Sequence, residues 1–224
     1  MGISIVIPAL DEVGVLPALL HDLQGLRAAG AELVVCDGGS TDGTRDLAQQ
    51  LCDRLVVGPP GRALQLNAGA AAARGDPLVF LHADSRVPGP AAALLGALCA
   101  DDGWGFFPVR LDGESRLLPV VAAAMNLRSR LSGIGTGDQG LIVSRRLFDA
   151  VGGFPLQPLM EDIELCRRLR ARRWPDVAAS AIRSSGRRWD REGALRTILL
   201  MWRLRLRYFL GADPARLARE YHGG

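Results

Sequence analysis

Carboxylate side chains follow short apolar runs at three places in the first 84 residues of the chain. Asp11 and Glu12 come after the first run, Asp37 after the second and Asp84 after a later one. Carboxylate oxygens suit a hard divalent cation such as Mg²⁺ or Mn²⁺, and they accept hydrogen bonds from a base or a ribose. Taken alone, however, Asp-Gly-Gly-Ser at residues 37–40 is also a common turn sequence.

Chemistry-bearing side chains recur in the second half of the chain. Glu161 and Asp162 open a segment with apolar residues at helical spacing, and Arg187-Arg188-Trp189 follows further on. Acids at a helix N-terminus are stabilised by the helix dipole, which is a sufficient structural reason for the acidic pair by itself. The Gly-rich residues 133–140 are, by themselves, a loop.

The segments that must position these side chains alternate between strands and helices in the first 81 residues. Strands are predicted at residues 3–7, 33–36, 55–57 and 78–81, with helices at 13–26, 44–51 and 64–74. Such alternation predicts an α/β fold with a parallel sheet and crossover helices. Ligands of open parallel sheets lie beyond the carboxyl ends of the strands, where the three polar clusters fall.

Past Trp104 the pattern is less regular. Helices are predicted at residues 117–131, 161–173 and 193–210, with a strand at 141–143 and a last helix around 214–221. We therefore expect one α/β domain at residues 1–190 and a C-terminal helical extension at 191–224.

The formal net charge is only +3, and neither it nor any motif indicates a nucleic-acid partner. The distribution is uneven, because residues 161–224 hold 15 Arg and 8 acidic residues. A basic tail fits phosphates, an anionic ligand or an anionic lipid surface, and it equally fits a solvated face. The four cysteines show no CxxC spacing, and neither a secretory signal nor a spanning run is evident. We expect a cytoplasmic location.

The segments at residues 5–12 and 34–44 together resemble the opening of family 2 glycosyltransferases with the GT-A fold. The resemblance continues through residues 80–85, 135–140 and 161–162, and covers roughly residues 1–190. The small size and Ser-Gly-Arg-Arg-Trp at residues 185–189 also resemble the compact subgroup associated with arsenosugar biosynthesis. The resemblance implies a GT-A-like, Rossmann-type nucleotide-binding fold with a mixed, mainly parallel sheet.

The resemblance also implies a nucleotide-sugar site. Its residues would be Pro8, Ala9, Asp11, Glu12, Asp37, Gly39, Arg62, His82, Ala83 and Asp84. His82-Ala83-Asp84 stands where the family has Asp-x-Asp, so Asp84 would bind Mg²⁺ or Mn²⁺ at the diphosphate. His82 departs from the pattern, and it fits a ribose contact or a structural hydrogen bond. Arg62 fits a phosphate contact or a solvated loop.

For the catalytic side, the resemblance makes Asp162 the general base that deprotonates the acceptor hydroxyl, with Glu161 in support. Arg188 would stabilise the departing diphosphate. Asp138, Gln139 and Trp189 would contact the acceptor.

The implied reaction is an inverting transfer, most simply of a hexose, from a nucleotide-diphosphate sugar to an acceptor hydroxyl. A UDP-sugar is favoured and a GDP-sugar is an alternative; the acceptor is a small molecule or is lipid-linked. A sugar-nucleotide pyrophosphorylase should show a Gly-rich loop with a basic residue after the first strand, where Asp11 and Glu12 stand instead. A dinucleotide oxidoreductase is disfavoured because no strand is followed by GxGxxG. A non-catalytic module that binds sugar nucleotides or a membrane surface remains an alternative.

The helix predicted at residues 193–210 has two apolar arcs separated by arginines. One arc holds Leu195, Ile198, Leu199, Trp202, Leu206 and Phe209; the other holds Leu200, Leu204 and Tyr208. A surface helix needs only one arc to pack on its domain. Either both arcs are buried, by the last helix or by a second subunit of a homodimer, or the helix lies at the anionic inner surface of the membrane.

Overall fold

The first part of the chain is a regular alternation of parallel strands and helices. The computed structural model describes residues 2–88 and 102–223. Its first elements are β1 (Ser4–Ala9), α1 (Leu16–Ala28), β2 (Glu32–Asp37), α2 (Thr44–Leu51), β3 (Arg54–Val57), α3 (Arg62–Ala72) and β4 (Leu78–Phe80). The strands are rich in β-branched and aliphatic residues, which favour extended backbone. The predicted order of strands and helices is confirmed for this part.

The first helix starts later than the sequence predicts, at Leu16. The backbone N–H groups of residues 11–13 instead donate to the side chains of Ser40, Thr44 and Asp42. Because these donors are satisfied by a neighbouring loop, the chain gains nothing by winding them into the helix. The loop after β1 is thus fixed against the loop after β2.

The second part of the chain has shorter strands and more varied helices. Its elements are β5 (Trp104–Phe106), β6 (Val109–Asp112), α5 (Leu118–Ser132), the short 3₁₀ helix η1 (Gly137–Gln139), β7 (Leu141–Val143), α6 (Arg145–Ala150), α7 (Glu161–Arg170), β8 (Asp176–Val177), β9 (Ile182–Ser185), α8 (Arg187–Glu192), α9 (Ala194–Phe209) and α10 (Pro214–His222). The predicted strand at 141–143 and the four predicted helices are present, although α7 ends before residue 173. Sequence patterns did not predict β5, β6, β8, β9, α6 or α8.

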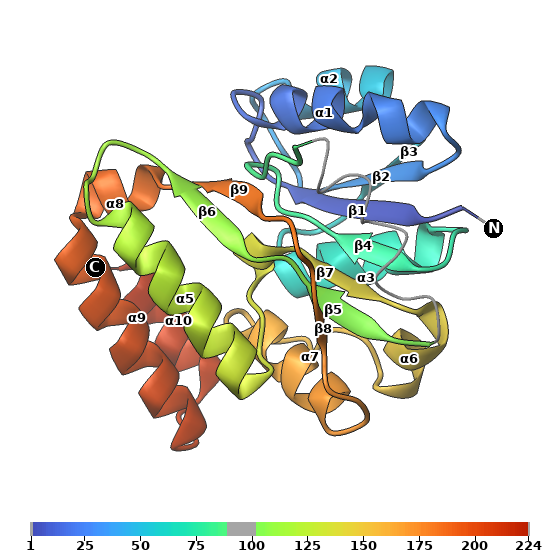
Figure 1. Ribbon diagram of the computed structural model, residues 1–224. Coiled ribbons are helices and arrows are strands. Elements are labelled where there is room, and N and C mark those ends of the chain that lie inside the picture. Colours follow the sequence, from blue (N-terminus) through green and yellow to red (C-terminus); the bar gives the residue numbers. More distant parts are fainter. Residues whose placement is uncertain (1, 89–101, 224) are drawn as a thin grey trace.

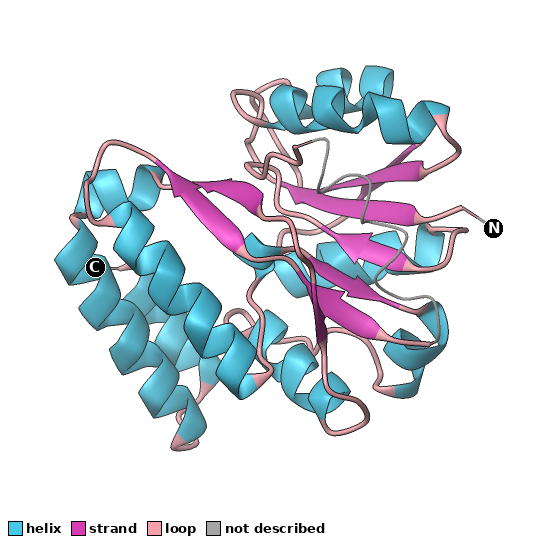
Figure 2. Cartoon of the chain, in the orientation of Figure 1, coloured by secondary structure: helices cyan, strands magenta, loops and turns pink. Residues whose placement is uncertain are grey.

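The central sheet is mixed and mainly parallel. Its strand order is β3-β2-β1-β4-β7-β5-β8, and β6 and β9 form a separate parallel pair (Figure 1). The strands β1 to β4 run parallel to one another, while β7 runs antiparallel to both β4 and β5. Helices cover both faces (Figure 2). The predicted α/β class, with a mixed sheet, is confirmed.

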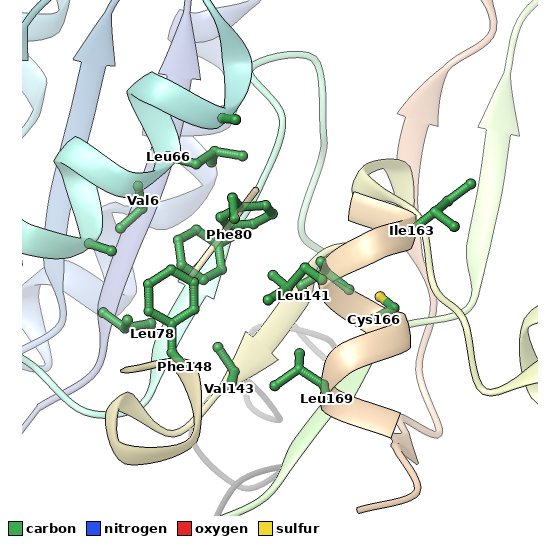
Figure 3. Close-up of a cluster of buried hydrophobic side chains, with 14 of the residues drawn as sticks. Val6, Leu66, Leu78, Phe80, Leu141, Val143, Phe148, Ile163, Cys166 and Leu169 are labelled. Atoms are coloured by element: carbon green, nitrogen blue, oxygen red, sulfur yellow. The ribbon is translucent and has the colours of Figure 1, made fainter. Parts of the chain in front are cut away.

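Two apolar cores lie on the two faces of this sheet. Alternate residues of β1 serve both, since Ile5 and Ile7 pack with α1 and α2 while Val6 packs with α3. In the second core Phe80 meets Phe148 and Phe154, and residues of α7 close it (Figure 3). The three described cysteines, Cys36, Cys52 and Cys166, are free and buried, and Cys99 lies outside the described residues.

The helix α9 packs on the domain through one face. Leu204 is fully buried, and Leu200, Met201 and Tyr208 pack against the second core beside α10. Most of the other arc is uncovered: Trp202 is 67% exposed, four of the other five members are also exposed, and Ile198 is half-buried. The expectation that the last helix buries both arcs is therefore wrong: α10 lies against the inner face and leaves the outer one open.

Candidate functional site

A cavity of about 650 Å³ opens at the carboxyl ends of β1 and β4. We call its first side the N-terminal wall; the predicted residues on it are Pro8, Ala9, Glu12, Arg62, His82, Ala83 and Asp84. Pro8 and Ala9 end β1, beyond the last residue of β1 that pairs with β4, so the proline ring interrupts no ladder hydrogen bond on that side. Most of this wall therefore lies at or just after strand ends, which is where ligands bind in open parallel sheets.

Three other predicted donor residues lie outside the cavity lining. Asp37 is buried and accepts hydrogen bonds from the backbone N–H groups of Gly39 and Ser40 and from Arg45. Burial tends to raise the pKa of Asp37, but these hydrogen bonds outweigh it and hold the pKa below its ordinary value. Asp37 and Gly39 thus build the turn after β2. Asp11, the third, has a left-handed backbone (φ 53°) and accepts a hydrogen bond from the Thr41 N–H at 2.8 Å.

The opposite side of the cavity, the C-terminal wall, comes from loops and helix starts. Its predicted residues are Asp138, Glu161, Asp162, Arg188 and Trp189. Met160 precedes α7 with φ 65°, an uncommon value for a side chain of this size. This sharp entry turns the first two residues of α7 toward the cavity.

Asp162 is held by two backbone hydrogen bonds. Its Oδ2 accepts from the Gly137 N–H at 2.9 Å, and its Oδ1 accepts from the Ile163 N–H at 2.7 Å. Each carboxylate oxygen has a second lone pair, so an acceptor hydroxyl can still be bound from the cavity. The carboxylate is thus fixed in orientation at the cavity surface.

Glu161 is more deeply buried than its neighbour. Its Oε1 lies 3.4 Å from Arg62 Nη1, so the ion pair connects the two walls. Burial and the charge of Asp162 raise the pKa of Glu161, and Arg62 only partly opposes this. A buried carboxyl group with a raised pKa beside a second carboxyl group is an arrangement common at catalytic sites.

His82 also reaches across the cavity, to Asp138. Nδ1 of His82 lies 3.3 Å from Asp138 Oδ1, which also accepts from the Ser184 hydroxyl. Desolvation tends to raise the pKa of Asp138. The contact with His82 and the charge of Arg62 together have the larger effect, so the pKa of Asp138 lies below its ordinary value. A Cβ on Gly137 would come within 2.1 Å of His82 Nε2, so the ring packs directly against this glycine.

Asp84 and Glu12 share one cationic partner that sequence reasoning did not assign. Nη2 of Arg187 lies 3.0 Å from Glu12 Oε2 and 3.6 Å from Asp84 Oδ2. A single guanidinium thus neutralises the two carboxylates that line this part of the cavity. Desolvation lowers the pKa of Arg187, but the two carboxylates raise it more, so its pKa lies above the ordinary value.

A divalent ion fits this pair of carboxylates. Mg²⁺ and Mn²⁺ favour oxygen ligands, and Mg²⁺ commonly takes one or two carboxylates together with substrate phosphates. Within residues 2–88 and 102–223 no group of three or more His, Cys, Asp or Glu side chains is placed to hold a metal. Asp84 and Glu12, which share Arg187, could supply two carboxylates to such an ion.

Gln139 does not line the cavity. Its side chain is fully buried, where it accepts hydrogen bonds from the Ser129 hydroxyl and the Thr136 N–H and donates to Asn126. This network fixes η1, the short helix that carries Gly137 and Asp138. The structure thus places Gln139 behind the wall rather than in it.

Three helices that follow β9 complete the C-terminal wall. Arg188 of α8 lies 3.1 Å from Glu192, donates to the Tyr221 carbonyl and covers the Tyr221 ring, whose centroid is 3.7 Å away. Arg205, on the inner face of α9, also lines the cavity. Its Nε is buried and has no hydrogen-bond partner among the described residues.

Sequence reasoning thus missed several residues of the lining. Besides Arg187 and Arg205 these include Leu10, Pro60, Gly61, Gln65, Thr136, Gly137, Pro158, Leu159, Met160, Ile163, Ser185, Thr197, Met201 and Tyr221. Arg187 belongs to the segment 185–189 that the sequence singled out, but there Arg188 was predicted to contact the diphosphate and Arg187 was given no role. The sequence did indicate a Gly-rich loop around Gly137 and an apolar arc on α9. No nearby sequence feature indicated that either one lines a cavity.

Comparison with known proteins gives matches to glycosyltransferases. Residues 4–102 match the family described as "Glycosyl transferase family 2". A "PGL/p-HBAD biosynthesis glycosyltransferase" of Mycobacterium tuberculosis (strain ATCC 25177 / H37Ra) is 40% identical over 91 residues. The aligned part is 38% of this chain and 36% of that protein, so the chain spans about a third of this curated relative.

Solved structures extend the likeness to most of the chain. S. aureus TarS 1-349 in complex with UDP-GlcNAc has a TM-score of 0.63 at 17% identity, over 83% of this chain and 58% of that one. Glucosyl-3-phosphoglycerate synthase from Mycobacterium tuberculosis, in complex with Mn²⁺, uridine diphosphate and phosphoglyceric acid, has a TM-score of 0.56 at 25% identity. That match covers 82% of this chain and 68% of the other. The fold is therefore of the GT-A type, and residues 4–102 are similar in sequence to family 2 glycosyltransferases.

Proposed function

We propose that the protein transfers a sugar from a nucleotide-diphosphate sugar to an acceptor hydroxyl, with inversion at the anomeric carbon. One observation carries the proposal: Asp84 and Asp162 face one cavity from opposite walls. The first suits a metal-bound diphosphate and the second suits an acceptor hydroxyl. The space between them has the volume of a ligand pocket.

The N-terminal wall would hold the donor. Asp84, assisted by Glu12, would bind Mg²⁺ or Mn²⁺, which when bound neutralises charge on the diphosphate. Arg187, which now pairs with both carboxylates, would then be available as a second cation for the phosphates. His82 and Ala83 would contact the ribose or the base together with Pro8 and Ala9. A UDP-sugar is favoured, because the synthase at 25% identity was crystallised with uridine diphosphate, and a GDP-sugar is the alternative.

The C-terminal wall would hold and activate the acceptor. Asp162 takes the proton of the acceptor hydroxyl while that oxygen bonds to the anomeric carbon. The bond from the anomeric carbon to the diphosphate breaks at the same time, and the diphosphate leaves with the electron pair. Attack from the side opposite to the leaving group inverts the configuration. Glu161, Asp138 and Trp189 would position the acceptor, and Arg188 would stabilise the leaving diphosphate.

The transferred sugar is proposed to be a hexose, and the acceptor to be a small molecule or a lipid-linked group. Membership of the compact subgroup associated with arsenosugar biosynthesis is proposed from the resemblance of residues 185–189. Arg187, Arg188 and Trp189 of that segment all line the cavity.

Two other functions make different predictions. A sugar-nucleotide pyrophosphorylase would need a cation at the loop after β1, but that loop presents Glu12 to the cavity. A non-catalytic binding module would bind nucleotide sugars without breaking the anomeric bond. The fixed Asp162 carboxylate gives such a module no advantage, and it therefore favours an enzyme.

The proposal is tested with a panel of UDP- and GDP-sugars and Mn²⁺. Binding stabilises the folded state by mass action, so the right donor should raise the thermal midpoint. The same mixtures are then followed for release of free sugar and nucleoside diphosphate, which reports slow hydrolysis without an acceptor. Binding without hydrolysis or transfer, for every donor and acceptor class, would identify a binding module. No binding to any nucleotide sugar would contradict the proposal.

A further inference from the structure

The outer face of α9 is an exposed apolar stripe. Its members recur every three or four residues, which places them on one side of a helix. They are Leu195, Leu199, Trp202, Leu206 and Phe209, with exposed fractions of 67%, 67%, 67%, 62% and 57%. The inner face of the same helix packs on the domain. Folding therefore uses one face of α9 and leaves the other to water.

The helix α5 has a second stripe of this kind. Val120, Leu127 and Leu131 are 65%, 60% and 73% exposed, and the exposed Ala123 and Ala124 lie between them. We call the eight large side chains on the two helices the α5–α9 apolar surface. They make up half of the 16 exposed large hydrophobic residues in the described part of the chain. Single exposed apolar residues are normal, but such concentration marks an interaction site.

The two stripes belong to the same flank of the molecule. The backbone N–H groups just before α5 donate to Asp190 of α8, which directly precedes α9. At the C-terminal end of α5, the Ser132 carbonyl accepts a hydrogen bond from Arg170 of α7. Near the C-terminal end of α9, the Tyr208 hydroxyl donates to Glu164, which also belongs to α7. Both helices thus run from α8 to α7, as Figure 1 shows.

The charged side chains on the helices α5 and α9 themselves are all positive. Together α5 and α9 contain six arginines and no Asp or Glu. Arg203 and Arg207 share Glu220, whereas Arg130 and Arg196 are exposed and form no ion pair with any described residue. Two copies packed face to face would bring arginines against arginines. An anionic surface would instead be attracted by every uncompensated arginine.

We propose that the α5–α9 apolar surface docks on a bilayer that contains anionic lipids. Apolar side chains, Trp202 among them, would enter the interface, and Arg130 and Arg196 would contact lipid headgroups. The association would be peripheral, because no helix in the described residues is both long and apolar enough to cross a bilayer.

Docking would also bring the cavity close to the lipid. The inner face of α9 lines the cavity through Thr197, Met201 and Arg205, so the cavity and the apolar surface are about one helix diameter apart, roughly 10 Å. An acceptor carried by a lipid would then reach Asp162 without leaving the interface. This last consequence rests on the proposed function, but the docking itself does not.

The test is flotation of the full chain with vesicles. Vesicles of phosphatidylcholine alone are compared with vesicles that also contain phosphatidylglycerol, at low and at high salt. The chain should float with the anionic vesicles at low salt and be released by salt, because headgroup attraction is screened. Replacing Arg130 and Arg196 with Gln should lower the bound fraction about tenfold. Absence of flotation at low salt would overturn the proposal.

A matched pair of variants separates specific docking from general stickiness. The double change Leu199→Glu and Trp202→Glu alters the proposed surface, while Val57→Glu alters another exposed apolar residue, on the edge strand β3 of the central sheet. The first should abolish flotation and the second should leave it unchanged, with equal thermal midpoints. Flotation that survives the double change overturns the proposal. So does a concentration-dependent dimer that the double change dissociates, which would make this face a protein interface. Nucleotide-sugar binding in the absence of vesicles is measured in parallel and should not change, so a failure of the proposed function is seen separately.

Discussion

The two walls of the cavity are built in different ways. The N-terminal wall follows strand ends in a parallel sheet, so the topology of the sheet brings Glu12 and Asp84 to the same cavity. The C-terminal wall depends on the left-handed backbone conformation of Met160 just before α7, on the buried polar network around Gln139 and on the inner face of α9. One wall is therefore fixed by topology and the other by tertiary packing. If the proposed function holds, donor binding depends on the first and transfer on the second.

The strongest way to break this division is to change Asp162 to Asn. The substitution keeps the shape and one acceptor atom but removes the base, so transfer should fall by about 10²–10⁴-fold. Donor affinity should stay within a few-fold, because Asp162 lies on the C-terminal wall. Steady-state transfer and nucleotide titration measure the two effects. A variant that retains wild-type transfer would move the base elsewhere, with Glu161 and Asp138 to be tested next.

The next largest effect concerns packing of the C-terminal helices. Leu204 is fully buried whereas Leu206, two residues further on, is 62% exposed. Leu204→Ala should lower the free energy of unfolding by about 2–5 kcal/mol, and Leu206→Ala should change it by less than about 0.5 kcal/mol. Denaturant unfolding measures both. A single transition in each case would show that residues 191–224 unfold with the rest; two transitions would support the predicted division at residue 190.

A smaller effect is expected at Asp84, the proposed metal ligand of the N-terminal wall. Asp84→Ala should weaken binding of a nucleoside diphosphate by about tenfold, the scale of one charge-assisted contact, and abolish its dependence on Mn²⁺. Titration calorimetry with and without Mn²⁺ measures this, and Asp149→Ala, at an exposed position on α6, is the matched control. Wild-type affinity that is equal with Mn²⁺ and with EDTA would remove the metal from the proposal.

The same division explains what the sequence could predict. Glu12 and Asp84 were found because alternating strands and helices fix where strand ends lie. Arg187 follows β9, which pairs with β6. The sequence did not predict either strand, because Arg-Leu-Asp in β6 and Arg-Ser-Ser in β9 are largely polar. Asp37, in contrast, had the right residue type at a strand end, but its hydrogen bonds close a local turn.

The outer face of α9 teaches a related point. The helical wheel showed two apolar arcs, and only packing decides which arc faces the core. Leu204 is buried because the inner face lies over the second core, between α10 and the cavity. Periodicity predicts the helix but not its rotation about its own axis.

The smallest expected effect tests whether Glu161 and Asp138, both on the C-terminal wall, respond oppositely to pH. The folded-state pKa of Glu161 is raised above 4.5 by burial and by Asp162, so its contribution to stability is fully present below about pH 4.5 and is lost as pH rises through the folded pKa. The pKa of Asp138 is held below 3.8, chiefly by His82 against desolvation, so its contribution is present above that value and is lost as pH falls.

Glu161→Gln should therefore raise the thermal midpoint at pH 7 and have little effect at pH 4. Asp138→Asn should lower the midpoint at pH 7, and its effect should shrink in acid. Thermal unfolding of the two variants between pH 3 and pH 8 measures the difference. Parallel shifts of the same sign would mean that the two carboxyl groups share one environment, and the contrast between the buried helix start and the His82 contact would be lost.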